Sequence, residues 1–524
     1  MADTFVPVDP TAYVVQQNQA AAAKQPPGGS RDFECAQRGL MAVPNEPLVH
    51  LPDSGNVVWD FTAFDFLEMD TPESVAPGVW RHGQLDAPSG LFHVTDGLYQ
   101  VRGYDLANLT VVEGPDALVV IDPLGSYETA RAALTLFRST TGNSKPVRAV
   151  VHTQSGVDHF GGVRGLFDGA VPADLKVYAP DGFLADAVLR QVTQGAHNAK
   201  LADYAYGTRL DASPRGLVDS DLGRTVSLGG AGFLAPTDTV GGVLSPSTPK
   251  DAWPSWTGVA WQDGLYAVEV AGVQLVLQPA GGHASPAEMN VYLPASKAVY
   301  LAGAGLLGAP GKARADLLNA TTTAFGTTAR IGFGAYGWPV WEALTDEGTP
   351  AGDVSAWLAA RRTAATAVPD AGPVAPLLAT PGYLDTPSRT VREVWAKLNG
   401  TALGAPQLAA TAKAGLLLPG SAGKQVDAAQ RAYDDTVPDY AKAVLLLDPV
   451  ISAAAIPLAV PAATEKQARA LQSRALTQLG YLAPHARLRN ALLTAAHDVL
   501  DPGSAVTRFT QTVGDLAAYA NPLA

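Results

Sequence analysis

The chain has 524 residues, 47% of them hydrophobic and 16% charged, which is long enough for two or more domains with large cores. Its formal net charge of −13 argues against a nucleic-acid-binding surface, since polyanions need a basic face. The single cysteine, Cys35, excludes an intrachain disulfide and a thiolate metal cluster.

The first thirty residues contain no apolar segment flanked by positive charge, so we expect no secretory signal. The most apolar stretch, residues 443–460, is interrupted by Asp448, Pro449 and Pro457, and it is therefore a poor membrane span. Together these features predict a cytoplasmic protein without a membrane partner. Residues 1–31, which run into Pro and Gly, are predicted to form a flexible arm.

Short strand patterns alternate with helical ones after this arm. Residues 117–122 (ALVVID) and 147–153 (VRAVVHT) have the pattern of buried strands, and residues 127–139 between them form an amphipathic helical pattern. A loop rich in Gly and Ser follows the second strand, which is where α/β folds commonly hold their sites. Further hairpins are predicted over residues 265–279 and 290–303.

From about residue 385 the pattern becomes helical. Amphipathic segments joined by short loops predict an all-α domain, assigned to residues 376–524. These segments cover residues 389–398, 427–435, 438–447, 464–480 and 488–500.

Several stretches, in order along the chain, resemble the alkyl sulfatases of the metallo-β-lactamase superfamily. The clearest are YQVRGYDLAN (99–108), DHFGGVRG (158–165), SPAEMNVYLP (285–294) and ALTQLGYLAPHARLRNALLTAAHDV (475–499). The resemblance implies an α/β fold, with a four-layer αββα sandwich over residues 32–375 and a helical, dimerisation-type domain after it. It also implies a pair of zinc ions that activate water for attack on a sulfate ester.

Most of the zinc ligands that the resemblance implies are missing. At the matching positions the chain has Gln154, Gly156, Asp158, His159, Ala284, Gly303 and Tyr336–Gly337. Catalytic zinc normally has three protein ligands, so we expect the zinc site to be lost, with no other cofactor in its place. His152 is a substitute ligand only if its predicted strand turns the other face to the site.

The retained pair and one lysine are the candidate catalytic groups. A carboxylate beside an imidazole, as at Asp158 and His159, can act as a general acid or base. Lys200, where the family usually has an arginine, can pair with a sulfate or carboxylate. The alternatives are that Asp158 and His159 only hold their loop and that Lys200 is a solvated surface residue. The candidate substrate-binding residues are Tyr104, His197, Tyr206, His283, Lys312, Arg314 and Tyr336.

These residues lead to a first hypothesis of a metal-independent enzyme. It would act on a sulfate ester by intramolecular displacement, for example aziridine formation in specialised-metabolite biosynthesis. The alternative is a non-catalytic scaffold subunit, and a zinc-dependent hydrolase is the third possibility. The expected partners are a small-molecule substrate, sulfated and either free or bound to a carrier protein, and a second copy or partner subunit on the helical domain.

Overall fold

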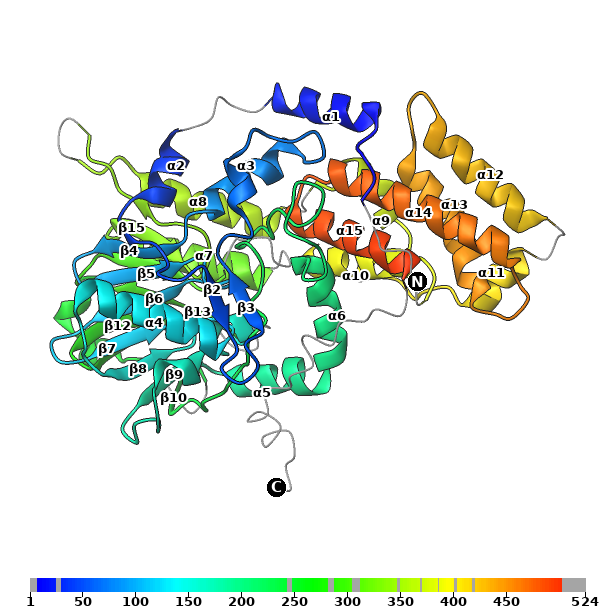
Figure 1. Cartoon of the computed structure of the whole chain (residues 1–524). Coiled ribbons are helices and arrows are strands. Elements are labelled where there is room, and N and C mark those ends of the chain that lie inside the picture. Colours follow the sequence, from blue (N-terminus) through cyan, green and yellow to red (C-terminus); the bar gives the residue numbers. More distant parts are fainter. Residues whose placement is uncertain are drawn as a thin grey trace, which may run out of the picture.

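The computed structural model describes residues 7–24, 30–242, 247–280, 287–303, 312–345, 349–367, 370–384, 386–399, 403–416 and 420–501. Within these ranges a layered α/β domain lies beside an all-α domain (Figure 1).

The first sheet of the α/β domain has eight strands in the order β1-β4-β5-β6-β7-β8-β9-β10. Their bounds are β1 (Leu40–Ala42), β4 (Gly90–Thr95), β5 (Leu98–Arg102), β6 (Leu109–Glu113), β7 (Leu118–Ile121), β8 (Val147–Val151), β9 (Lys176–Pro180) and β10 (Asp238–Val240). The strands from β4 to β7 pair antiparallel, and those from β7 to β10 pair parallel. Helix α4 (Tyr127–Thr141) makes the crossover that the parallel pair β7–β8 needs, as the sequence predicts.

The second sheet has six strands, in chain order from β11 to β16. Their bounds are β11 (Tyr266–Val270), β12 (Val273–Pro279), β13 (Met289–Leu293), β14 (Ala298–Leu301), β15 (Ile331–Gly334) and β16 (Val340–Trp341). The predicted hairpin is confirmed, and its turn residues Ala271 and Gly272 both have positive φ, at 53° and 71°, as a two-residue hairpin turn requires. A separate pair of strands is formed by β2 (Leu48–His50) and β3 (Val57–Asp60).

The two sheets pack face to face and helices cover their outer faces. Ile121 and Val151 of the first sheet lie in one apolar core with Met289 of the second. Helix α4 covers the outside of the first sheet through residues such as Phe137. Helices α7 (Lys312–Phe325) and α8 (Asp353–Thr366) cover the outside of the second, where Leu358 is fully buried. The αββα prediction is confirmed.

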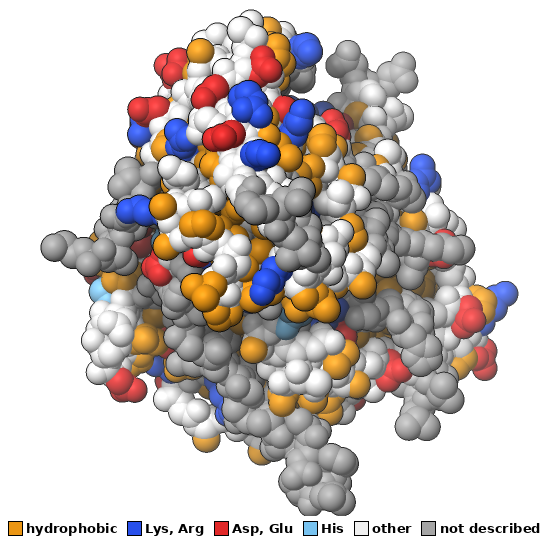
Figure 2. Space-filling view, turned by 90° about the vertical axis from the view of Figure 1, so that its right-hand side faces the viewer, with side chains coloured by type: hydrophobic (Ala, Val, Ile, Leu, Met, Phe, Trp, Pro, Cys, Tyr) orange, Lys and Arg blue, Asp and Glu red, His pale blue; other side chains and the backbone are white. Residues whose placement is uncertain are grey.

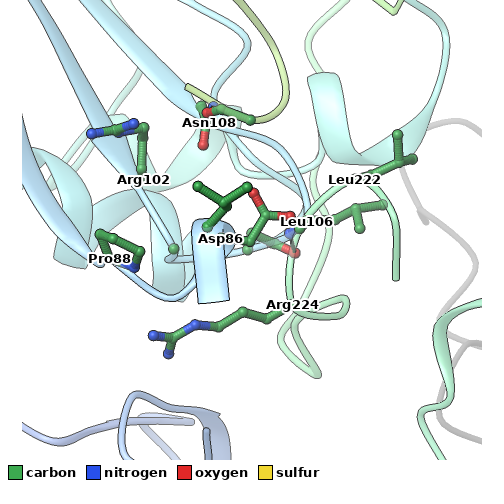
Figure 3. A pocket seen from close by; sticks show the side chains of 12 residues that line it. Asp86, Pro88, Arg102, Leu106, Asn108, Leu222 and Arg224 are labelled. Carbon is green, nitrogen blue, oxygen red and sulfur yellow. Dashed lines mark hydrogen bonds between the residues drawn. The ribbon is translucent and has the colours of Figure 1, made fainter. Parts of the chain in front are cut away.

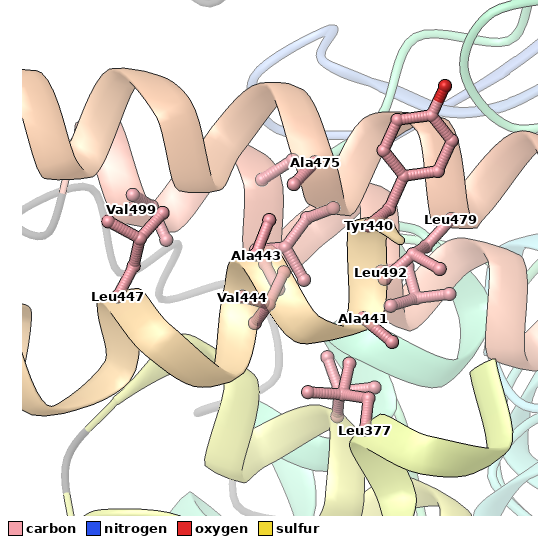
Figure 4. Packing of buried hydrophobic residues seen from close by; sticks show 14 of the residues in the cluster. Leu377, Tyr440, Ala441, Ala443, Val444, Leu447, Ala475, Leu479, Leu492 and Val499 are labelled. Carbon is pink, nitrogen blue, oxygen red and sulfur yellow. The ribbon is translucent and has the colours of Figure 1, made fainter. Parts of the chain in front are cut away.

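The helical domain packs around one apolar core, to which Leu447, Leu479 and Leu492 all belong (Figure 4). Its main helices are α9 (Ala375–Leu378), α10 (Pro387–Asn399), α11 (Ala409–Gly415), α12 (Ser421–Asp434), α13 (Tyr440–Ala454), α14 (Ala462–Leu482) and α15 (Ala486–Leu500). The predicted helical segments are confirmed. Ala371 and, from α6 (Gly195–Tyr206), Leu201 also belong to this core, and the predicted boundary at residue 376 stays a prediction.

The N-terminal segment differs from the predicted flexible arm. Helix α1 (Ala12–Ala22) lies on the helical domain, and Val14 is 0% exposed. The Thr11 hydroxyl is 2.6 Å from the Tyr440 hydroxyl, and the Asn18 amide donates to the carbonyl oxygen of Tyr481 over 3.2 Å. The sequence of this helix has no one-sided apolar pattern, because only Val14 and Asn18 of the helix are buried.

Two observations concern the surface and the membrane. On the face that Figure 2 shows, Lys and Arg side chains are interspersed with Asp and Glu, so the described residues there form no single basic patch. Among the helices of the described ranges, none has the length and apolar character that crossing a membrane requires.

Candidate active site

Asp158 and His159 lie in η2 (Val157–His159), a single 3-10 turn in the loop after β8. The following Gly162 lets this loop pack on the loop after β7, since a Cβ there would overlap the carbonyl oxygen of Pro123. The His159 side chain is 0% exposed, whereas that of Asp158 is 14% exposed. Only the carboxylate of the predicted pair is therefore open to a small molecule.

Asp122, directly after β7, holds one side of the His159 ring. Its Oδ2 accepts hydrogen bonds from His159 Nδ1 over 2.9 Å and from the Tyr300 hydroxyl over 2.6 Å. The backbone N–H of Thr153 donates to Oδ1 over 2.8 Å. Asp122 is fully buried and has a positive φ of 52°, a conformation that non-glycine residues seldom adopt. The surrounding donors fix this carboxylate in place.

Tyr336 holds the other side of the ring. Its hydroxyl lies 2.9 Å from His159 Nε2 and donates to Asp158 Oδ2 over 2.6 Å. The side chains therefore form one continuous chain of hydrogen bonds, Asp122–His159–Tyr336–Asp158, which we call the His159 network.

The charges in the network determine where its protons lie. Burial by itself lowers the pKa of His159, but the negative charges of Asp122 and Asp158 outweigh it and raise that pKa to about 9. Burial, and then the charge of Asp158, raise the pKa of Tyr336 well above its ordinary value. At neutral pH His159 is thus an imidazolium that donates from both nitrogens, and Tyr336 is a neutral phenol. The role of His159 as a general acid or base stays a prediction, and both of its ring nitrogens are engaged by Asp122 and Tyr336.

The positions that the resemblance assigns to zinc ligands do converge here. A Cβ on Gly303 would lie 2.7 Å from Gln154 Nε2 and 3.8 Å from the Tyr336 ring. A Cβ on Gly156 would lie 3.1 Å from Gln154 Oε1 and 2.7 Å from Asp158 Oδ1. Several of the implied ligand positions therefore lie close together in space.

The residues at these positions do not fit a pair of zinc ions. Both ring nitrogens of His159 are engaged with Asp122 and Tyr336, and a neutral amide and two glycines replace imidazole and carboxylate groups. Within the described residues, the one cluster of three potential ligand side chains lies elsewhere, at His82, Asp86 and Asp219.

His152 does not replace a missing ligand. Its ring stacks on Phe183, with centroids 5.4 Å apart and planes 5° apart, and its Nδ1 lies 3.2 Å from the carbonyl oxygen of His159. Burial lowers its pKa to about 4. The ring belongs to the aromatic core behind the loop.

Two further predicted residues border the network. Burial raises the pKa of Tyr206, and the nearby Asp158 carboxylate adds to this effect. Arg314 Nη2 lies 3.5 Å from Oε2 of the buried Glu288, whose charge also acts on His159.

The other predicted site residues lie outside the network. Tyr104 is 2% exposed and packs edge-on against Phe61 at 4.6 Å, in the core under α4, so it is not placed to bind a substrate here. His197 and Lys200 are exposed on α6 (Gly195–Tyr206), whose opposite face packs into the helical domain. His283 and the side chain of Lys312 are outside the described residues.

Sequence analysis missed Asp122, Tyr300 and Glu288 as parts of the site. The sequence did contain a sign of Asp122, which is a charged residue at the end of the apolar strand pattern of residues 117–121, directly before Pro123. Tyr300 and Glu288 come from the second sheet, and only the packing of the two sheets brings them to the loop after β8.

A small separate cavity lies beside helix α3 (Pro77–Asp86). Asp86, Arg102 and Arg224 are among its lining residues (Figure 3), and its volume is about 20 Å³. That volume holds about one water molecule. Arg102 donates to the carbonyl oxygen of Ala36 over 2.8 Å, so its guanidinium joins structural elements.

Comparisons with known proteins agree with the fold. The metallo-beta-lactamase superfamily model matches residues 102–285. A linear primary-alkylsulfatase from Pseudomonas sp. is 35% identical over 341 residues, which cover 62% of this chain and 47% of that protein. The alkyl/aryl-sulfatase BDS1 of Saccharomyces cerevisiae is 31% identical over 62% of this chain and 49% of its own. The chain thus spans about half the length of these two relatives.

Other matches extend over both domains. An (R)-specific secondary-alkylsulfatase from Pseudomonas sp. is 31% identical over 94% of this chain and 74% of its own length. The solved structure of the stereoselective inverting sec-alkylsulfatase Pisa1 from Pseudomonas sp. superimposes with a TM-score of 0.78 and 28% identity, over 95% of this chain and 79% of that one.

Proposed function

The chain belongs to the alkylsulfatase family of the metallo-β-lactamase superfamily, and from this premise we propose that it acts on a small sulfate ester without a resident zinc ion. The observation that carries the proposal is the position of the Tyr336 hydroxyl. It bridges His159 Nε2 and Asp158 Oδ2, the retained groups that the resemblance implies as metal ligands.

The proposed reaction is an intramolecular displacement. The lone pair of an amine in the substrate attacks the neighbouring sulfated carbon, so a C–N bond forms and the C–O bond to sulfate breaks. Sulfate leaves with the bonding electron pair, and the new ammonium nitrogen gives up one proton. The product of a vicinal amino-sulfate is an aziridine, which suits a role in specialised-metabolite biosynthesis. Such a reaction needs orientation and a proton acceptor, but no activated water.

We assign the acceptor role to Asp158, because its carboxylate is the partly exposed member of the network. Its negative charge would also hold the amine end of the substrate. His159 acts as a positioning residue, since its side chain is fully buried, and the Tyr336 hydroxyl fixes Asp158 Oδ2. Arg314 pairs with Glu288 beside the network, and Lys200 is exposed on α6, so neither receives a role in this reaction.

The non-catalytic alternative is favoured by a specific observation. Protein groups occupy both nitrogens of the buried His159 and one oxygen of Asp158, and the glycine after them is required for packing. A network saturated in this way also serves a purely structural purpose.

The deciding experiment measures sulfate release and metal content on the same sample. Protein expressed with added zinc and then desalted is incubated with a 2-aminoalkyl sulfate or with the matching alkyl sulfate lacking the amine. We expect negligible zinc by plasma mass spectrometry and chelator-resistant sulfate release from the amino compound alone.

Two variants complete this experiment. Asp158→Asn should abolish release, whereas Asp168→Asn, at a carboxylate 84% exposed, should leave it unchanged. About two zinc ions per chain, as in paired-metal hydrolases, would overturn the metal-free proposal. Absence of release from both compounds would favour the scaffold alternative.

A further inference from the structure

A second, larger cavity is lined in part by Tyr336. Its volume is about 130 Å³, room for a small organic molecule rather than a single water. It is bordered by α2 (Ser30–Gln37), by α3, by the loop after β15 and by α8, which lie on one side of the molecule (Figure 1). The aromatic residues Tyr336, Trp338 and Trp357 contribute to the lining.

Three charged groups of this lining already have charged or capping partners. Asp32 pairs with Arg81 at 3.0 Å. His82 Nδ1 lies 2.8 Å from a carboxylate oxygen of Asp219. The carboxylate of Asp221 accepts from the first backbone N–H groups of α15, at 2.8 and 2.9 Å.

Arg361 is the exception. Within the described part of the chain its guanidinium contacts the Trp357 ring, at 4.2 Å from the centroid, and has no carboxylate partner. Trp357 and Arg361 are four residues apart on α8 and so share one helix face. Burial lowers the pKa of Arg361 to about 10, which leaves it charged at neutral pH. A half-buried cation without a counter-ion costs stability, and a bound anion would reduce that cost.

We propose that this cavity is an organic-anion site, in which Arg361 pairs with a carboxylate or sulfate group and the indoles of Trp338 and Trp357 pack against the body of the ligand. Guanidinium groups bind both anions through paired N–H donors. The inference deepens the proposed function and rests on it for identifying the anion as the substrate. Tyr336 connects the two sites, because it lines the cavity and its hydroxyl lies 2.6 Å from Asp158 Oδ2.

The test is calorimetric titration of the full chain with hexyl sulfate, hexanoate and neutral 1-hexanol. We expect both anions to bind and hexanol to bind at least about tenfold more weakly, since a charge-assisted pair is worth about that factor or more. The anion that binds with the lower dissociation constant shows whether the site prefers a sulfate or a carboxylate group. Equal binding of all three probes would overturn the proposal.

Variants of the arginine sharpen the test. Arg361→Gln should weaken anion binding about tenfold or more and leave hexanol unaffected, and Arg361→Lys should fall between it and the parent. The control is Arg362→Gln, which removes the same charge from the next, exposed position. The thermal midpoint of Arg361→Gln should not fall, because the change removes an uncompensated charge.

These outcomes also separate the inference from the proposed function. Anion binding that depends on Arg361, without sulfate release from any probe, would retain the site and reject the reaction. Sulfate release with anion binding unchanged in Arg361→Gln, or equally weakened in Arg362→Gln, would reject the site and retain the reaction.

Discussion

The Tyr336 hydroxyl is shared by His159 and Asp158, so its removal tests the site at the scale of one atom. Tyr336→Phe leaves the buried Nε2–H of His159 with Asp158 Oδ2 as an acceptor only at 3.7 Å, too long for a hydrogen bond. We expect the free energy of unfolding to fall by roughly 1–3 kcal/mol, the cost of an unsatisfied buried donor. Chemical denaturation at pH 7 measures this change.

The matched control is Tyr292→Phe. Tyr292 is also buried, but it stacks on Phe325 at 4.8 Å and lies outside the His159 network. The free energy of unfolding of Tyr292→Phe should differ little from that of the parent protein. Equal losses in both variants would mean that the phenol oxygen at position 336 has no special partner.

A second prediction concerns His159 and the pH dependence of the unfolding free energy. Its pKa is higher in the folded protein, about 9, than the ordinary value of 6.5, so protonated His159 stabilises the fold. This contribution is complete below pH 6.5 and is lost as the pH rises through about 9. Unfolding free energy measured from pH 6 to 10 should therefore fall by roughly 3 kcal/mol from this residue.

Asp122→Asn provides the reference for that measurement, since it removes the charge that most raises the pKa of His159. Groups such as His82 titrate in both proteins, so the difference between the two curves isolates the network. Parallel curves would contradict the prediction. If the variant does not fold, the histidine ring signals in a nuclear magnetic resonance titration of the parent protein give the same pKa directly.

Residue-level prediction succeeded where the motif was local. The sequence placed Asp158, His159 and Tyr336 at one site through a resemblance, and the structure brings them within hydrogen-bonding distance. It could not place Asp122, because a carboxylate at the end of a strand becomes a partner of His159 only through the geometry of two neighbouring loops. Tyr104 lies in the core under α4, where a segment that resembles the family serves packing.

At the scale of elements, the loop after β8 depends on its glycines. A Cβ on Gly162 would overlap the carbonyl oxygen of Pro123 and lie 2.7 Å from the Cβ of Ala130. Backbone atoms cannot move aside as the end of a side chain can, so Gly162→Ala should destabilise the fold by about 3 kcal/mol or more. Gly169→Ala is the control, since nothing lies within 4 Å of a Cβ there. Thermal unfolding that does not separate the two variants would contradict this account.

The same packing changes how the retained DHFGG segment should be interpreted. Its Phe160 is fully buried among Phe183 and Phe233, and Gly162 is sterically required. Retention of this segment therefore needs no catalytic explanation. Asp158 is the one residue of the segment for which its partial exposure leaves room for chemistry.

Elements with a strong hydrophobic pattern were predictable from the sequence, whereas helix α1, which has no such pattern, was not. The buried runs of β7 and β8 and the amphipathic face of α4 were visible in the sequence. Helix α1 was not, because one side chain at Val14 and the amide of Asn18 hold it to a distant helix. Such contacts join segments far apart in sequence and leave no periodic signal.

At the scale of the whole molecule, Arg489 of α15 ties the two domains together. Its guanidinium is fully buried and donates to the carbonyl oxygens of Ser74 over 2.7 Å and of Pro214 over 2.9 Å, both in the α/β domain. Since these bonds cross the domain boundary, we expect the parent protein to unfold in a single calorimetric transition.

Arg489→Met should uncouple this boundary, because it removes the guanidinium donors to both carbonyl groups, although that of Pro214 keeps the Ser74 hydroxyl as a donor over 2.7 Å. We expect the transition to shift down, with a loss of about 3 kcal/mol or more, and to separate into two steps. Arg431→Met makes the same chemical change at an exposed position of α12 and should leave one unshifted transition. Two transitions already in the parent protein, or a shift of equal size in both variants, would show that the domains fold independently and that Arg489 only fills space between them.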